Sequence, residues 1–455
     1  MYIRMQFGRV RNAQTLSWKF VRERRDTTMP MSASFKNRLF PLLKDIVNHF
    51  GTPFHLYDAK GIQETGTDLI AAFSEIDLFR EYYAVKALPN PRILRILKDL
   101  GFGFDCSSVP ELLLSRKIGS RGEDIMFTSN NTSTTEFEKA ASGGGCILNL
   151  DDISLVSKVP QMPERISFRY NPGAKRTGNN IIGDPLESKY GVSSTQLCQA
   201  YQMAIQRGAK KLGIHTMLAS NELNHDYMIH TVQMLLETVE TLSGALGQRF
   251  EFVNMGGGLG IPYHPSETPL NLKEMAAAIT TLFISFKDRN GYVPRLYMES
   301  GRYITGPHGV LVTSAINRKD IYRTYIGVDA SMSSLMRPAI YGAYHHIDIL
   351  GKRATENDKK VDVVGSLCEN NDKFAIQRRL PDIDAGDILC IHDTGAHGYS
   401  MGFNYNGRLR PKELLLCADG TVALIRREEH VEDYFATLNF EPDTMRPAKH
   451  ASRAA

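Results

Sequence analysis

The sequence has few cysteines and no long hydrophobic run. Its 455 residues include six cysteines, which are scattered and form no CxxC pair, so the sequence predicts neither a disulfide framework nor a structural zinc site. No segment approaches the roughly 18 consecutive apolar residues of a membrane span. These absences argue against a secreted disulfide scaffold and an integral membrane protein. We expect a cytoplasmic protein with no membrane partner and no metal.

The sequence also has no excess of positive charge outside residues 1–31. The formal net charge is +4, but residues 1–31 carry seven Lys or Arg against two acidic residues, which leaves the rest of the chain at −1. A nucleic-acid partner is therefore not expected. We predict that residues 1–32 are a basic tail outside the fold, either a targeting segment or an extension before a start at Met29 or Met31. Residues 441–455 are predicted to form a C-terminal tail.

Short apolar runs alternate with helical patterns between about residues 79 and 308, within a barrel domain predicted over residues 59–308. Near-continuous apolar strands separated by helices are typical of a parallel sheet. Eight such units in about 230 residues favour a (β/α)₈ barrel of the TIM type over a doubly wound sheet. The predicted strands begin with 81–85 and continue with 103–106, 124–128, 146–150, 165–170, 211–215, 250–254 and 295–299.

The pattern changes after residue 309. Strand-like runs at 310–313, 325–329, 361–364, 387–391, 413–416 and 422–425 follow one another without long helices. We predict an all-β domain formed by residues 309–440 together with residues 33–58, whose strand at 53–57 joins the same sheet.

One lysine stands at the end of an apolar strand. Lys86 follows Tyr82-Tyr83-Ala84-Val85, and burial there would disfavour its charged form and make it a good Schiff-base former. A lysine that reaches solvent from the strand end is the alternative.

Residues that could bind a cofactor follow the last two predicted barrel strands. Gly256-Gly257-Gly258 follows the seventh strand, and Glu299-Ser300-Gly301-Arg302 follows the eighth. In a (β/α)₈ barrel these loops often bind phosphate at the same mouth that holds the end of strand one. A lysine, a glycine loop and a lone carboxylate together suit pyridoxal 5'-phosphate, whose protonated ring is a strong electron sink.

The chain resembles the fold-type III pyridoxal-phosphate decarboxylases and, among them, the diaminopimelate decarboxylases. The resemblance covers about residues 50–435 and implies a barrel, a β-domain and a homodimer with shared active sites. It rests on motifs at 83–87, 104–108, 168–173, 256–261, 299–302, 337–345, 368–372 and 400–406.

The resemblance also implies roles for individual residues. Lys86 would form the Schiff base and Glu299 would pair with the pyridine nitrogen. The phosphate side would be held by Gly257, Gly258 and Arg302, with Ser220 as a possible helper. Cys368, from the partner subunit, would protonate the α-carbon after CO₂ leaves, although a buried inert thiol is the commoner fate of cysteine.

The far end of the substrate would need its own residues. Diaminopimelate carries a distal carboxylate, which Arg337 and Tyr341 suit, and a distal ammonium, which Glu369 suits. Arg302 belongs to this substrate-binding set as well.

Three positions depart from the family pattern, and the mildest change is Ser300 in place of the proline of the usual Glu-Pro-Gly-Arg. The ring-stacking histidine is replaced by Met217, whose thioether can still pack on an aromatic ring. The tyrosine that touches the phosphate is replaced by His397, which could donate to phosphate with a pH dependence.

These expectations combine into one predicted function with alternatives. The predicted reaction is decarboxylation of meso-2,6-diaminoheptanedioate to L-lysine, the last step of lysine biosynthesis. The alternatives are another substrate on the same fold (ornithine, arginine or a carboxylated polyamine), an amino-acid racemase, and a non-catalytic cofactor-binding relative. Glu299 speaks against the racemase, which usually places a cation beside the pyridine nitrogen.

Overall fold

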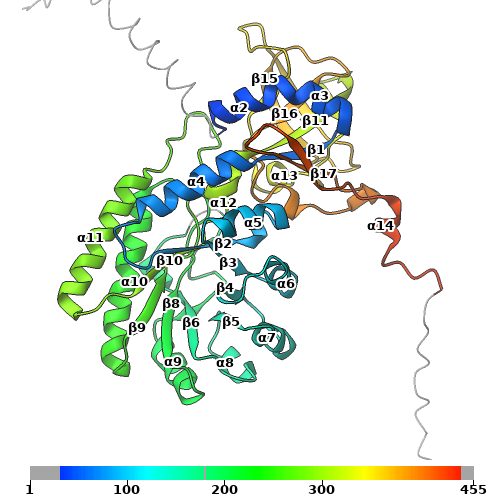
Figure 1. The fold of residues 1–455 in the computed structure, drawn as a ribbon. Coiled ribbons are helices and arrows are strands. Elements are labelled where there is room, and N and C mark those ends of the chain that lie inside the picture. Colours follow the sequence, from blue (N-terminus) through cyan, green and yellow to red (C-terminus); the bar gives the residue numbers. More distant parts are fainter. Residues whose placement is uncertain (1–30, 179–180, 442–455) are drawn as a thin grey trace, which may run out of the picture.

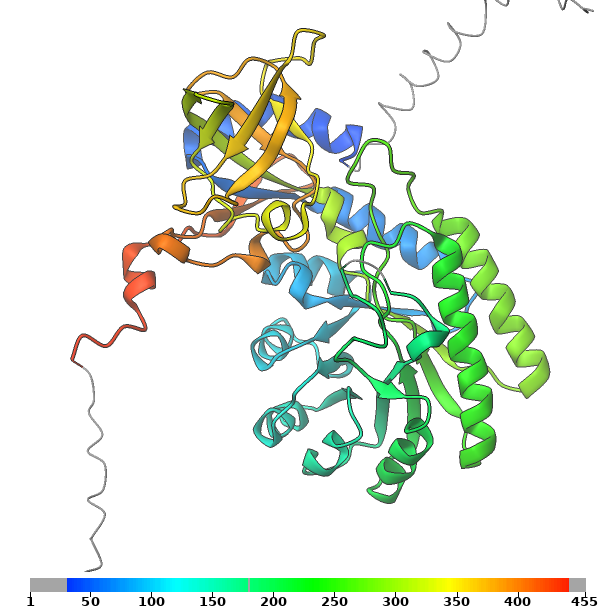
Figure 2. The same cartoon turned by 180° about the vertical axis from the view of Figure 1, so that it is seen from behind.

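A computed structural model describes residues 31–178 and 181–441 (Figures 1 and 2). The tails predicted at the two ends lie outside the described residues except for their inner ends. Met31 is buried, and the Ser32 side chain caps the first described helix by accepting a hydrogen bond from the Phe35 N–H. No helix within the described ranges is long and apolar enough to cross a membrane.

Eight parallel strands form a closed barrel, as the sequence predicts (Figure 1). Neighbours in the barrel are hydrogen-bonded in the order β5-β4-β3-β2-β10-β9-β8-β6, and pairing between β5 and β6 closes it. The short β7 extends the sheet from β6. The bounds are β2 (Arg80–Ala84), β3 (Gly103–Cys106), β4 (Gly122–Ser129), β5 (Cys146–Leu150), β6 (Arg165–Asn171), β7 (Val192–Ser193), β8 (Lys211–His215), β9 (Phe250–Asn254) and β10 (Arg295–Met298).

Helices surround the barrel, and their ends carry the expected local signals. Asn90 caps α5 ahead of Pro91, and Gly247 and Gly291 end the two longest helices in the left-handed conformation. The helices and turns of this region are α4 (Ala59–Ala72), η2 (Val85–Ala87), α5 (Pro91–Asp99), α6 (Val109–Lys117), α7 (Thr134–Ala141), α8 (Leu155–Lys158), η3 (Gly173–Lys175), α9 (Leu197–Gln206), α10 (His225–Leu246), α11 (Leu272–Asn290), α12 (Arg302–Thr305) and η4 (Gly306–His308).

Aromatic side chains fill part of the barrel interior. Tyr82, Phe252 and Tyr297 form a buried cluster there, with the Phe252 and Tyr297 rings stacked at 4.6 Å between centroids. Gly213 makes room for this cluster, since a Cβ at that position would lie 2.1 Å from the Phe252 ring. The interior is a packed core, so open space is left to the mouth formed by the carboxyl ends of the strands.

A second, mostly antiparallel sheet lies beside the barrel (Figure 2). β1 (Phe54–Asp58) joins it as predicted, antiparallel to β11 (Gly309–Asp320) and parallel to β17 (Lys412–Leu416). The exact domain limits stay a prediction. The other elements are α2 (Ala33–Leu39), η1 (Phe40–Leu42), α3 (Leu43–Phe50), β12 (Thr324–Val328), α13 (Arg337–Tyr341), β13 (Ile347–Ile349), β14 (Lys359–Val364), β15 (Lys373–Leu380), β16 (Ile388–Ile391), η5 (Tyr399–Met401), η6 (Tyr405–Gly407), β18 (Val422–Arg426) and α14 (Val431–Phe435).

Candidate active site

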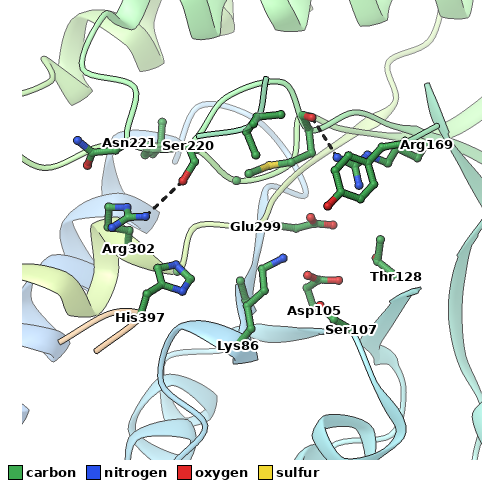
Figure 3. Close-up of a pocket in the computed structure, with 18 of the residues that line it drawn as sticks. Lys86, Asp105, Ser107, Thr128, Arg169, Ser220, Asn221, Glu299, Arg302 and His397 are labelled. Carbon is green, nitrogen blue, oxygen red and sulfur yellow. Dashed lines mark hydrogen bonds between the residues drawn. The ribbon is translucent and has the colours of Figure 1, made fainter. Parts of the chain in front are cut away.

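A pocket of about 190 Å³ opens at the carboxyl end of the barrel strands (Figure 3). It gathers residues from strand ends that are far apart in the sequence. All eight residues predicted to bind the cofactor line it: Lys86, Met217, Ser220, Gly257, Gly258, Glu299, Arg302 and His397.

The strand before Lys86 ends one residue earlier than the sequence predicts. The strand β2 ends at Ala84, and Lys86 follows on the 3₁₀ turn η2, where its side chain is exposed to the pocket. The exposed side chain agrees with the alternative of a lysine that reaches out of the strand end, because the turn carries it out of the apolar strand. The turn is held from the β-domain, since the Ala87 carbonyl accepts hydrogen bonds from the His397 N–H at 2.9 Å and from the Ser400 hydroxyl at 3.3 Å.

Glu299 is a buried carboxylate at the end of β10. His215 Nε2 lies 3.1 Å from one of its oxygens, and the Asn254 side-chain amide donates to the other at 2.7 Å. Burial alone would raise the pKa of Glu299, but His215, Lys86 and the Asn254 hydrogen bond together hold it below its ordinary value. The site thus contains an ionised carboxylate away from water.

Asp105 is a second buried carboxyl group at the mouth and was not predicted as a site residue. Burial and the nearby Glu299 raise its pKa to about 8, against the opposing effect of Lys86. Its Oδ1 atom has no hydrogen-bond partner among the described residues. The signal was present in the sequence, because a carboxyl group between Phe104 and Cys106 on an apolar strand is unusual.

The glycine loop packs closely against neighbouring backbone. A Cβ on Gly257 would lie 2.3 Å from the Glu299 carbonyl oxygen, and one on Gly258 would lie 2.7 Å from that of Ala219. The missing side chains therefore let two loops meet, which the sequence did not indicate. Within the described part of the chain, the N–H groups of Gly257 and Gly258 donate to no protein acceptor. Both residues line the pocket, so these donors can serve an anionic ligand.

Arg302 and His397 lie near the glycine loop. The Arg302 guanidinium donates to the Tyr263 hydroxyl at 2.7 Å and to the Ser220 hydroxyl at 3.3 Å (Figure 3). Burial lowers the pKa of His397 well below its ordinary value, and the nearby cations Arg302, Lys86 and Arg337 act in the same direction. The imidazole is therefore neutral near pH 7. The expected pH dependence of phosphate binding by His397 requires a bound anion that offsets these cations.

Met217 is held in place by Arg169. The guanidinium donates to the Met217 carbonyl at 3.2 Å and lies 3.6 Å from the Asp151 carboxylate. Arg169 also stacks on the Tyr190 ring at 4.2 Å. Arg169 also lines the pocket, so the same side chain pairs with Asp151 and faces the pocket.

Arg337 lies behind the pocket wall and does not line the pocket. It is buried, donates toward His345 Nε2 at 2.8 Å, and stacks on the Tyr263 ring at 4.2 Å. Tyr263 also contacts Arg302. Two guanidinium groups thus contact the same aromatic residue.

The remaining predicted residues lie outside the pocket of their own chain. Tyr341, at the end of α13, is 47 % exposed, and Cys368 is exposed on a loop between β14 and β15. The Cys368 N–H donates to the Asn406 side chain at 2.7 Å. Glu369 is half-buried beside Cys368 and accepts a hydrogen bond from the Asn371 N–H.

The pocket residues fit pyridoxal 5'-phosphate. An amine stands beside two carboxyl groups, one ionised and one neutral, and the Arg302 guanidinium lies across the pocket from Asp105 (Figure 3). The backbone of Gly257 and Gly258 lines the same pocket. The amine and carboxyl groups suit the aldehyde and ring nitrogen, and the guanidinium and glycine backbone suit the phosphate.

Comparisons with known proteins agree with this chemistry. Residues 65–306 match the family model "Pyridoxal-dependent decarboxylase, pyridoxal binding domain". The chain is 44 % identical over 423 residues to Protein TabA of Pseudomonas amygdali pv. tabaci, covering 92 % of this chain and 99 % of that protein. It is 38 % identical over 402 residues to the diaminopimelate decarboxylase of Methanothermobacter thermautotrophicus, covering 87 % of this chain and 93 % of that protein.

A solved structure shows the same architecture. The diaminopimelate decarboxylase of Helicobacter pylori, complexed with L-lysine, matches with a TM-score of 0.79 at 28 % identity, over 87 % of this chain and 98 % of that one. A lysine on the turn after the first barrel strand and a carboxylate after the last are what a pyridoxal-phosphate enzyme requires. The chain belongs to the pyridoxal-phosphate-dependent decarboxylases of fold type III, and within them to the diaminopimelate decarboxylase type.

Proposed function

We propose that this decarboxylase converts meso-2,6-diaminoheptanedioate to L-lysine and CO₂. The observation that carries the proposal is the pair of buried guanidinium groups, Arg302 and Arg337. Among the described residues, neither forms an ion pair with a carboxylate, and both contact Tyr263. Unpaired buried cations favour a ligand with more than one anionic group. The cofactor phosphate would supply one anion, and the distal carboxylate of the substrate would supply the second.

Residues of this chain would hold the cofactor and keep its ring nitrogen protonated. Bound pyridoxal phosphate supplies the electron sink that accepts the electron pair left when CO₂ departs. Lys86 would hold the cofactor aldehyde, and Glu299 would keep the ring nitrogen protonated. The phosphate would be held by Gly257, Gly258 and Arg302. Ser220 and His397 would complete that end, and Met217 would pack on the ring.

The acid that returns a proton to the α-carbon would come from a second copy of the chain. Cys368 and Glu369 lie outside the pocket of their own chain, on an exposed loop. A homodimer that places this loop over the partner's pocket would bring a proton donor and an anion for the distal ammonium group. Tyr341, exposed at the end of α13, would join Arg337 at the distal carboxylate.

The first experiment measures CO₂ release by the purified protein with pyridoxal phosphate. The four substrates are meso-diaminopimelate, L-lysine, L-ornithine and L-arginine. Turnover of diaminopimelate alone, with L-lysine as product, supports the proposal. Turnover of a substrate without a distal carboxylate overturns the role of Arg337 and favours the second candidate, a decarboxylase for another amino acid. The 44 % identity to Protein TabA, whose name states no substrate, keeps that candidate in the test.

A substitution tests the distal site directly. Arg337→Lys keeps the charge but loses the planar pair of donors, so KM for diaminopimelate should rise about tenfold or more while kcat changes little. Arg378→Lys is the matched control, because Arg378 is a neighbouring half-buried arginine that stacks on Tyr344. Equal effects of the two substitutions would remove Arg337 from the distal site.

A further inference from the structure

The carboxylate of Glu299 is fixed by residues at the ends of two other barrel strands. His215 is the last residue of β8 and Asn254 is the last residue of β9. His215 Nε2 lies 3.1 Å from Glu299 Oε2, and Asn254 Nδ2 donates to Glu299 Oε1 at 2.7 Å. His215 and Asn254 are 1 % and 0 % exposed, so solvent does not compete for either contact. Each carboxylate oxygen therefore has its own buried donor.

Asn254 connects this carboxylate to the glycine loop. Its side-chain oxygen accepts a hydrogen bond from the Gly256 N–H at 2.9 Å, while its amide donates to Glu299. The Gly256 carbonyl in turn accepts from the Glu299 N–H at 2.9 Å. The carboxylate and the start of the glycine loop thus form one hydrogen-bonded unit, and the positions of the two ends of the cofactor site depend on each other.

His215 differs from Asn254 because its ring can carry a proton. Its second ring nitrogen, Nδ1, is buried and has no hydrogen-bond partner among the described residues. Its interaction with Glu299 is therefore its main polar contact. Burial alone would favour the protonated form of Glu299, and the contacts from His215 and Asn254 oppose this together with Lys86.

We propose that His215 and Asn254 are positioning residues that keep the Glu299 carboxylate ionised and directed at the ring nitrogen of pyridoxal phosphate. The inference rests on the role proposed for Glu299. It predicts that His215 matters only for a cofactor that has a ring nitrogen, and that Asn254, which also holds the Gly256 N–H, matters more for such a cofactor than for one without it. A purely structural role in the barrel would affect every cofactor of the same shape equally.

Two cofactors separate these roles. Pyridoxal 5'-phosphate and its 1-deaza analogue, in which a C–H group replaces the ring nitrogen, are titrated into the apoprotein and followed by absorbance. His215→Leu should weaken binding of pyridoxal phosphate about tenfold to a hundredfold, because a hydrogen bond to a charged group is lost. The same substitution should leave binding of the deaza analogue unchanged. Asn254→Leu also removes the acceptor of the Gly256 N–H, so it should weaken binding of both cofactors, but it should weaken binding of pyridoxal phosphate more.

One further variant, His215→Gln, makes the result decisive. His215→Gln keeps a donor that cannot carry a charge, so its loss for pyridoxal phosphate should be smaller than that of His215→Leu. Equal losses for both cofactors in His215→Leu overturn the proposal, and so does unchanged binding of pyridoxal phosphate. If His215→Leu does not fold, His215→Gln and Asn254→Leu carry the same comparison.

Glu299→Gln separates this inference from the one it rests on. If that variant weakens the two cofactors equally, Glu299 does not act on the ring nitrogen, and both proposals fail. If Glu299→Gln discriminates between the cofactors but His215→Leu and Asn254→Leu do not, only the positioning role fails. Neither result depends on which amino acid the enzyme decarboxylates.

Discussion

Two carboxyl groups at the barrel mouth have pKa values displaced in opposite directions. The pKa of Glu299 is lowered, whereas that of Asp105 is raised to about 8. Both are buried, so the difference comes from their partners: Glu299 has His215 and Asn254, whereas one oxygen of Asp105 has no partner. Near pH 7 the site therefore contains one ionised and one neutral carboxyl group, an arrangement that separates a charge stabiliser from a proton donor.

Asp105→Asn tests the neutral state of Asp105. Because its pKa is raised, the neutral acid predominates below about pH 8 and is lost as the pH rises through that value. The wild-type kcat/KM should fall across this range. The amide is neutral at every pH, so the variant should lose this alkaline decline and keep activity within about tenfold of wild type at pH 7. A pH profile of kcat/KM from 6 to 9.5 is the measurement, and an unchanged decline in the variant would assign it to another group.

His397→Tyr tests the effect of phosphate on the imidazole. In the pocket His397 is held neutral by burial and by three cations. A bound phosphate opposes these cations and raises the pKa, so binding takes up a proton and weakens as the pH rises. A tyrosine does not titrate in this range. Affinity for pyridoxal phosphate, measured between pH 6 and 8.5, should therefore depend less on pH in the variant. Parallel curves for the two proteins would contradict this role.

At the scale of single elements, the carboxylate of Asp372 holds the loop that carries Cys368 (residues 365–372). Asp372 is 2 % exposed, and its two oxygens accept hydrogen bonds from the Met332 N–H at 2.7 Å and the Leu367 N–H at 2.8 Å. A Cβ on Gly365 would lie 2.3 Å from the same carboxylate. The loop is thus folded around Asp372, which fixes the exposed thiol without touching it.

Asp372→Ala should loosen this loop. It leaves two backbone donors without partners, so we expect kcat to fall about tenfold or more while the affinity for pyridoxal phosphate is unchanged. Cys368 is the exposed cysteine of the described chain, so its alkylation rate by iodoacetamide reports the loop directly and should rise. Asp382→Ala, at an exposed aspartate, is the control. An unchanged alkylation rate in Asp372→Ala would refute the positioning.

The sequence predicted the barrel strands well and the β-domain strands less well. The barrel strands are buried on both faces over most of their length, with β4 the most exposed, and they read as short apolar runs. β15 was missed because Lys373–Leu380 carries three charged residues and has exposed positions, and β13 because Ile347–Ile349 is only three residues long. His215 and Asn254 could not be assigned, since their contacts with Glu299 depend on the side-by-side pairing of β8, β9 and β10, which no local pattern records.

At the scale of the whole molecule, Glu413 joins the β-domain to the barrel. It is fully buried on β17 and accepts hydrogen bonds from the Tyr57 hydroxyl at 2.6 Å and the Asn90 amide at 3.0 Å. Arg426 completes the cluster through an ion pair. Asn90 begins the helix that follows the Lys86 turn, so a carboxylate of one domain supports the turn that carries Lys86 in the other.

Glu413→Ala removes the centre of this cluster. A cation and two donors are left buried without their acceptor, so the protein should lose about 3–5 kcal/mol of stability. Its affinity for pyridoxal phosphate should also fall, because the Lys86 turn loses support. Glu428→Ala is the control, since Glu428 pairs with Lys412 on the same strand but is 46 % exposed and should cost less than about 1 kcal/mol. Urea unfolding and cofactor titration are the measurements; equal stability of the two variants would contradict the account.

The support of the Lys86 turn also has a consequence for how the protein is made. Lys86 is synthesised early, but the groups that hold its turn, the His397 N–H, the Ser400 hydroxyl and the Glu413 carboxylate, belong to the last seventh of the chain. A ribosome-bound chain that has completed only the barrel has the lysine without its supports. We therefore expect cofactor loading to follow release of the finished chain, so that a nascent chain arrested near residue 330 captures pyridoxal phosphate far more weakly than the full-length protein.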